Sequence, residues 1–160
     1  MTDAPGLAAT ARQVIDTSRY LVLATADQHG VPWASPVWYA HEGYREFFWV
    51  SRPQARHSRN IETQPQVSIV IFDSSVPPGA ARAVYIRGAA ELTTGPELRR
   101  SIGIYSRRSH EQGLAEWTVS HVQAPADFRL YRAVAVEQSV LEPGGADVRI
   151  PVNTESIAAG

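Results

Sequence analysis

The residues best suited to bind or react with a ligand lie in one stretch, WVSRPQARHSRNI, from Trp49 to Ile61. Three arginines and a histidine fall within eight positions there, and no acidic residue appears before Glu62. A strand pattern also gives way to a helix pattern in this stretch. The free N–H groups and positive dipole end of a helix N-terminus favour an anion. The stretch therefore predicts an anion site, although a solvated basic helix face would have the same composition.

Individual side chains in this stretch suit a phosphate. Ser51 offers a hydroxyl donor, and Arg56 can grip a phosphate through two N–H groups at once. His57 can donate as well, more strongly when it is protonated. The chain contains no lysine. Any side-chain cation for a phosphate must therefore be arginine or charged histidine, and Schiff-base chemistry on a lysine is excluded.

Aromatic residues crowd the two strand patterns before this stretch: Trp33, Trp38, Tyr39, Phe47, Phe48 and Trp49. A flat heteroaromatic ring needs an apolar or aromatic slot of this kind, but aromatic strands also fill ordinary cores. Pro36 interrupts the first of these strands. Because proline cannot donate to a ladder, that strand should lie at an edge or be broken there. Its free backbone groups would then be available to a ligand.

These residues must be positioned by a mainly antiparallel sheet. Periodicity predicts helices at 7–18, 55–62 and 95–108, and strands at Tyr20–Ala26, 31–41, 45–51, 66–73, 83–93 and 128–141. Ser51 is expected to cap the second helix, with Pro53 in its first turn. Tight turns between the first three strands indicate a meander. The expected fold is a six- or seven-stranded antiparallel β-barrel with helices at its ends, and a tail beyond Gly144 that is mostly loop.

Composition limits the class of protein. At 160 residues the chain suits one domain, with a core at about 7–142 and a tail at 143–160. A net charge of -1 argues against nucleic-acid binding, and no apolar run could span a bilayer. Without a signal-peptide pattern, the cytoplasm is expected. The five histidines (His29, His41, His57, His110 and His121) lack metal-ligand spacing, so no metal is expected.

The run WVSRPQARHSRNIETQPQVSIVIFD resembles the FMN-binding split-barrel family typified by pyridoxamine 5′-phosphate oxidases. The likeness is good over 19–92, includes Gly88, and is looser in FRLYRAVAVEQSVLEP. It implies an FMN-binding oxidoreductase that acts on a small molecule. It also implies cofactor-binding residues. These are Val50 and Ser51 near the phosphate, Arg56 and His57 holding it, and Ser35, Pro36, Val37 and Trp38 along the isoalloxazine ring.

Departures from the family pattern affect the substrate more than the cofactor. The oxidases carry a lysine where this chain has Ala40 or His41, and usually another at the His57 position. A family glutamine is Ala83 here, and the C-terminal Arg-x-His is reduced to Arg149-Ile150-Pro151. Oxidation of pyridoxamine phosphate is therefore not expected, and the sequence singles out no catalytic residue.

Several alternatives remain open at this level. The family includes proteins that use a deazaflavin coenzyme and others that bind haem. Arg52 and Arg59 could supply the additional cations that the acidic tail of a deazaflavin coenzyme needs. A non-catalytic flavin-binding protein is a further alternative. A homodimer is expected with the cofactor at the subunit interface, because a ring-binding groove on a small barrel would otherwise leave apolar surface in water. Residues 105–117 are candidates for reaching across, Trp117 above all, although a core role for Trp117 in its own subunit is equally compatible.

Overall fold

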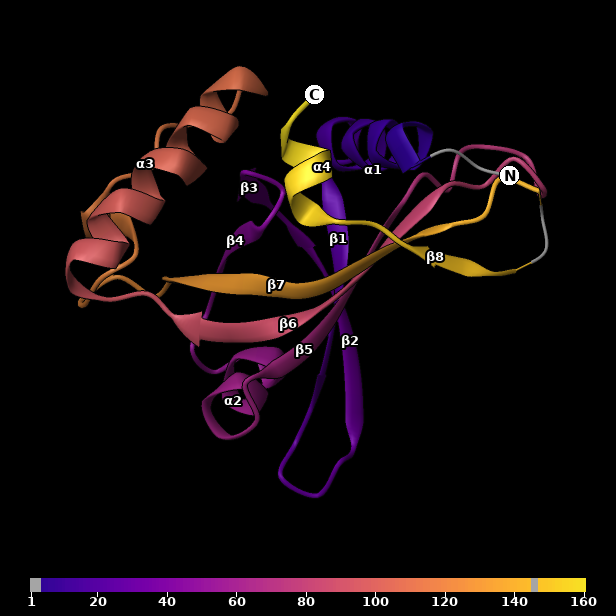
Figure 1. The fold of residues 1–160 in the computed structure, drawn as a ribbon. Coiled ribbons are helices and arrows are strands. Elements are labelled where there is room, and N and C mark those ends of the chain that lie inside the picture. The colour runs from indigo at the N-terminus through magenta and orange to yellow at the C-terminus, as the bar shows by residue number, and fades with distance from the viewer. Residues whose placement is uncertain (1–3, 145–146) are drawn as a thin grey trace.

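A computed structural model describes residues 4–144 and 147–160, which form a barrel-like sheet with helices at its ends (Figure 1). The strands and helices are, in chain order, α1 (Ala4–Thr17), β1 (Tyr20–Ala26), β2 (Pro32–Trp38), β3 (Ala40–Glu42), β4 (Glu46–Ser51), α2 (Arg56–Thr63), β5 (Gln66–Phe72), β6 (Ala83–Leu92), α3 (Gly95–Glu111), the 3-10 turn η1 (Val119–His121), β7 (Arg129–Leu141), β8 (Arg149–Pro151) and α4 (Thr154–Ala158).

The sheet is antiparallel throughout, with strand order β2-β1-β5-β6-β7-β4-β3, and β8 pairs with β7 off this path. The predicted antiparallel β-barrel of six or seven strands is confirmed, with seven strands on the path and the short β8 in addition. The path ends at β2 and at the short β3, which pairs only with the first half of β4. The rest of β4 contacts β2 without sharing a ladder with it, so the barrel is split between β2 and β4. Gly30, with φ of +79°, closes the β1–β2 turn in the left-handed conformation that glycine tolerates best.

Tyr39 separates β2 from β3, so the single strand predicted at 31–41 is wrong. Up to Trp38 the chain pairs with β1, and from Ala40 it pairs with β4 on the far side of the split. Tyr39 is fully buried at this change of partner, and its hydroxyl donates to the carbonyl of Ile15 at 2.6 Å. The prediction that Pro36 lies on an edge strand is confirmed, because β2 ends the path. β5 lies inside the sheet, between β1 and β6.

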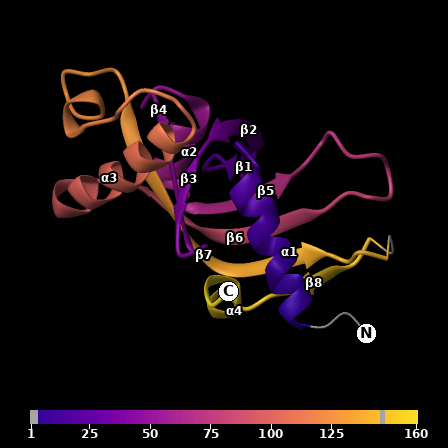
Figure 2. The ribbon, with the colours of Figure 1, turned by 90° about the horizontal axis from the view of Figure 1, so that it is seen from above.

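Two helices close the ends of the barrel. α1 lies at one end, where it crosses β5, β6 and β7, and α2 lies at the other (Figures 1 and 2). The helix predicted at 7–18 is confirmed as α1, which buries Leu7, Ala11, Val14 and Ile15 on one face. None of the described helices has the length and apolar character needed to cross a membrane.

The C-terminal residues are more ordered than the sequence predicts, and the expected loop beyond Gly144 is wrong from Arg149 onward. β8 extends the sheet, and α4 packs beside α1 with Ile157 fully buried in the core. Arg12 of α1 donates to the carbonyls of Ser156 and Ile157 at 3.2 and 2.8 Å. The apolar residues of this segment are too few to predict a helix without the surface that receives them.

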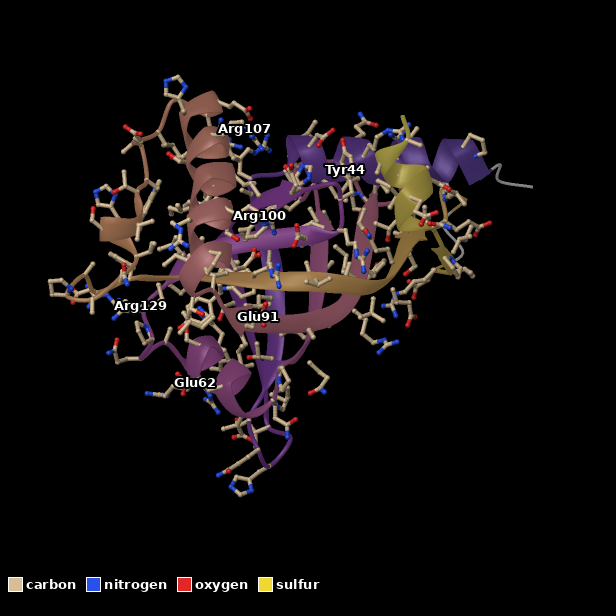
Figure 3. All side chains as sticks on the ribbon, turned by 60° about the vertical axis from the view of Figure 1, so that its left-hand side comes forward. Tyr44, Glu62, Glu91, Arg100, Arg107 and Arg129 are labelled. Carbon is tan, nitrogen blue, oxygen red and sulfur yellow. The ribbon has the colours of Figure 1, made fainter. Side chains whose placement is uncertain are left out.

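A second core lies between the sheet and α3, which runs longer than predicted. Phe47 faces the barrel core, whereas its neighbour Phe48 faces α3 and packs near Leu98 and Ile102. Ion pairs hold the helix over β7. Arg100 from α3 and Glu91 from β6 lie on either side of that strand (Figure 3), with Arg132 between them and joined to Glu91, Glu46 and Glu97.

Gly88 lies where β6 and β7 come closest. The register of this strand pair shifts between Arg87 and Gly88, which marks a bulge. A Cβ atom at position 88 would collide with the backbone carbonyl of Val134, which belongs to the ladder and cannot turn away. Glycine is therefore required here by close backbone approach.

Replacing Gly88 with alanine is expected to lower the free energy of unfolding by about 1–3 kcal/mol or more, because the added methyl group must push two paired strands apart. The matched control is Gly103→Ala in α3, where a Cβ would meet nothing within 4 Å. Helix propensity favours that change by roughly 0.5–1 kcal/mol. Urea denaturation measures both. Equal effects at the two positions would contradict this account of Gly88.

Candidate anion and cofactor site

His57 joins the two strands that border the split in the barrel. Its Nδ1 lies 3.1 Å from the hydroxyl of Ser35 on β2, and its Nε2 lies 2.8 Å from the hydroxyl of Ser51 on β4. β2 and β4 share no ladder, so this side chain bridges them in place of backbone hydrogen bonds. Three of the predicted site residues, far apart in sequence, are thus brought into direct contact.

Arg56, the residue before His57, turns the other way. Its guanidinium lies over the ring of Trp33, 4.7 Å from the centroid, in a cation–π contact. It forms no ion pair with the described residues. Trp33 is 41% exposed and shares a face of β2 with Ser35. Trp33 belongs to the aromatic pattern of the sequence. Because Trp33 and Ser35 are two residues apart in a strand, they share a face, and this spacing is the signal that could have placed Trp33 at the site that contains Arg56.

The first turn of α2 leaves its backbone donors available. The N-cap residue is Ala55, which has no side chain able to accept from them. The predicted capping role of Ser51 is wrong, because its hydroxyl is engaged with His57. Pro53 lies in the turn before the helix rather than in its first turn. Uncapped N–H groups, a positive dipole end and Arg56 therefore meet at one point.

A buried contact that the sequence reasoning missed fixes α2 against the sheet. Asn60 is 5% exposed, and its amide donates to the Thr25 hydroxyl on β1 at 3.0 Å. Its carbonyl accepts from the backbone of Gln64 where the helix ends. Asn60 and His57 lie one helical turn apart. Locking Asn60 to β1 therefore fixes where the first turn of α2 points.

The other predicted ring-lining residues lie on different faces of the sheet. Val37 is buried in the barrel core, so only its backbone is available to a ligand. Pro36 is exposed on the opposite face. Trp38 and Val50 share the outer cluster beneath α3, where the Trp38 indole donates to the side-chain oxygen of Gln112 at 2.8 Å.

Most of the aromatic residues singled out in the sequence lie in the hydrophobic core. Tyr39, Phe47, Phe48 and Trp49 are fully buried, which leaves Trp33 and Trp38 as the tryptophans within reach of a ligand near the split. Trp117 packs edge-to-face on Tyr105, with 5.5 Å between ring centroids, and joins the outer cluster of this same chain. Its contacts in the chain fit the core role.

The surroundings of His57 favour its neutral form. Burial lowers the pKa of His57 below its usual value, and neither ring nitrogen meets a carboxylate. A neutral imidazole donates from one nitrogen and accepts at the other, and a serine hydroxyl can be the partner in either hydrogen bond. The nearby Asp27 has a lowered pKa, mainly through the backbone N–H of Val31 and partly through the charge of Arg56.

Positions at which the sequence departs from the family pattern have structural roles here. Ala40 is fully buried in the outer cluster, and His41 hydrogen-bonds with Asp16 of α1 at 3.1 Å. Arg149 on β8 lies over the ring of Tyr85. Within the described residues, no group of three or more acidic, histidine or cysteine side chains could hold a metal ion.

Comparisons with known proteins agree with this architecture. The model of the family described as pyridoxamine 5′-phosphate oxidase matches residues 7–138, whereas no curated protein sequence matches the chain. Among solved structures, the chain is similar to a heme-binding protein from Mycobacterium smegmatis. The two are 24% identical with a TM-score of 0.75, over 99% of this chain and 62% of that one. The chain thus spans less than two thirds of that protein.

Two further structures show the same fold. A heme storage protein from Vibrio cholerae is 23% identical with a TM-score of 0.60, over 79% of this chain and 86% of that one. A protein described as an F420 reductase is 19% identical with a TM-score of 0.59, over 80% of this chain and 94% of that one. At these identities the likeness concerns the fold.

Proposed function

We propose that this chain, which belongs to the pyridoxamine 5′-phosphate oxidase family, binds FMN and serves as a flavin-dependent oxidoreductase. The observation that carries the proposal is the cluster of Ser35, Ser51 and His57 beside Arg56 at the uncapped start of α2. The contacts of His57 with the two serines bridge β2 and β4, and Arg56 beside them has no acidic partner among the described residues. A phosphate group would supply the negative charge that the site lacks.

The chemistry of these donors fits a phosphate. Two hydroxyls, an imidazole and a guanidinium lie where backbone N–H groups and a helix dipole also favour negative charge. The nearest carboxylate, Asp27, takes two backbone hydrogen bonds and does not pair directly with Arg56. The cation at the site is thus left for a ligand.

Pro36, Trp38 and Val50 provide apolar surface on the outer face of the sheet beside the split, and they would contact the ring of the cofactor. The free edge of β2 would offer backbone groups to the polar rim of the ring. When bound, the flavin supplies the electron-transfer chemistry, while the chain binds and orients it.

Pyridoxamine phosphate is not the substrate that these residues suit. The buried Ala40 supplies no charge where the oxidases carry lysine, and His41 is occupied by Asp16. Arg149, the remnant of the C-terminal motif, is engaged with Tyr85. We therefore propose a different small-molecule substrate.

A deazaflavin coenzyme is the second candidate. Arg59, one turn beyond Arg56, is exposed and forms no ion pair with the described residues. Arg52 is 60% exposed and pairs at 3.5 Å with Asp127, which is 70% exposed, so the pair is weak and easily exchanged. Two available cations beside the phosphate donors suit a coenzyme with an acidic tail.

We also propose a homodimer with the cofactor at its interface. The outer face of β1, β2 and β5 carries apolar cross-strand neighbours, Val22 between Pro36 and Val70 and Ala24 opposite Ala34. All of them remain half-buried or exposed in the single chain. This face adjoins the surface assigned to the ring, so a two-fold partner would cover both.

Purified protein is expected to take up FMN and show a flavin absorbance band. The donor cluster of Ser35, Ser51, Arg56 and His57 suits the phosphate of FMN, and the apolar face of β2 suits its ring. Calorimetry with FMN, the deazaflavin coenzyme and hemin in parallel makes the test selective. Binding of the deazaflavin alone would establish the second candidate. Binding of hemin alone, or of none of the three, would overturn the cofactor proposal.

Arg56→Ala is expected to weaken FMN binding by about 1.5–3 kcal/mol, the range for losing a charge-assisted hydrogen bond. Arg19→Ala is the matched control, because Arg19 is exposed beyond the end of α1. Arg12 cannot serve as a control, because it anchors α4. Titration of protein into FMN, followed by fluorescence, gives both affinities. A similar loss of FMN affinity in the two variants would show that Arg56 is an ordinary solvated surface charge with no role in binding.

Light scattering at micromolar concentration is expected to give twice the 17.5 kDa mass of the chain. Ala34→Glu places a charge in the proposed interface, so it should shift the measured mass toward that of a single chain and weaken FMN binding. Val136→Glu is the control, because Val136 is apolar and 69% exposed on β7, away from this face. A wild-type monomer that binds FMN tightly would disprove the interface site.

A further inference from the structure

His57 is held by hydroxyls alone. One ring nitrogen meets Ser35 and the other meets Ser51, at 3.1 and 2.8 Å. A serine hydroxyl both donates and accepts, so it supports either the neutral or the protonated ring. A carboxylate partner would instead favour the charged ring permanently. The geometry therefore leaves the charge of His57 to be decided by whatever enters the site.

The charged groups around His57 are engaged elsewhere. Arg56 on α2 lies over Trp33, and Asp27 at the end of β1 accepts from backbone N–H groups. At the ends of β4 and β7, Arg52 pairs with Asp127, and Arg129 donates to main-chain carbonyls. None of these charges contacts the imidazole. Burial is the influence that acts on it, and it lowers the pKa of His57 in the free protein.

A phosphate placed at the start of α2 changes this balance. A dianion at this point stabilises the imidazolium through its negative charge, while both ring N–H groups donate to the serine oxygens. The hydroxyls of Ser35 and Ser51 can rotate to accept from the ring or to donate to the phosphate. The proton comes from solvent, and no covalent bond changes.

We propose that His57 takes up a proton as the phosphate group of the ligand binds, so that this site binds a phosphate dianion and a proton together. The inference rests on the proposed function and adds a means of regulation to it. Ligand affinity becomes coupled to pH near neutrality. A lysine at this position would bind the same phosphate without that coupling.

The direction of the pH dependence follows from linkage. The pKa of His57 is lowered in the free protein and raised in the complex, so protons are taken up between the two values. Affinity is therefore highest at low pH and falls as pH rises through the pKa of the complex. The second ionisation of a phosphate monoester, near pH 6, acts in the opposite direction and is complete above about pH 7.

The test is the dissociation constant of FMN measured from about pH 7 to 8.5, where the phosphate no longer titrates. The wild-type constant is expected to rise roughly three- to tenfold across this range. His57→Lys should give a nearly constant value, because its ammonium stays charged. His57→Gln can still hydrogen-bond with the serines, and it should bind weakly and equally at all pH values.

Calorimetry on the wild-type protein makes the test independent of how the variants fold. Titrations of FMN in two buffers with different ionisation enthalpies should reveal net proton uptake near pH 7.5. A pH-independent constant, or the same slope in His57→Gln, would overturn the inference while FMN binding itself stands. Failure of the folded protein to bind FMN even at pH 6 would instead overturn the proposed function.

Discussion

The split between β2 and β4 is the constraint on which the rest of this structure depends. Two strands that share no ladder are held at a fixed separation by the His57 imidazole, with a serine hydroxyl on each side. That contact requires α2 to begin beside the split. It therefore brings an uncapped helix N-terminus, with its positive dipole end, to the same point. A bridge between strands and a site for an anion arise from one arrangement.

The chain passes from β2 to β3 across the split at Tyr39. At that residue it leaves the edge of β1 and joins β4, and the buried hydroxyl ties the crossing to α1. The crossing allows β2 to remain an edge strand, which is why Pro36 is tolerated and why the backbone of β2 stays available. It also sends the inner face of β2 toward His57 and the outer face toward the apolar surface shared with β1 and β5.

The distribution of the arginines shows which charges the fold uses for itself. Arg12 closes α4 onto α1, and Arg100 and Arg132 bind α3 to the sheet through Glu46 and Glu97. Arg56 and Arg59, in contrast, lie beside the split without an acidic partner among the described residues. Both side chains are exposed, so water solvates them in the free chain and they remain available to an anionic ligand.

The sequence by itself determined the local elements, because strand and helix periods depend on neighbouring residues. It placed β1, β5 and α1, put β2 at an edge through Pro36, and singled out Ser51, Arg56 and His57. Only the tertiary structure decided that His57 meets Ser35, since strand closure brings together residues 22 apart in sequence. It also decided that Val37 is core, that Ser51 bonds to His57 instead of capping α2, and that Ile157 belongs to the core. These outcomes depend on register and on which surfaces meet, and neither is encoded in local periodicity.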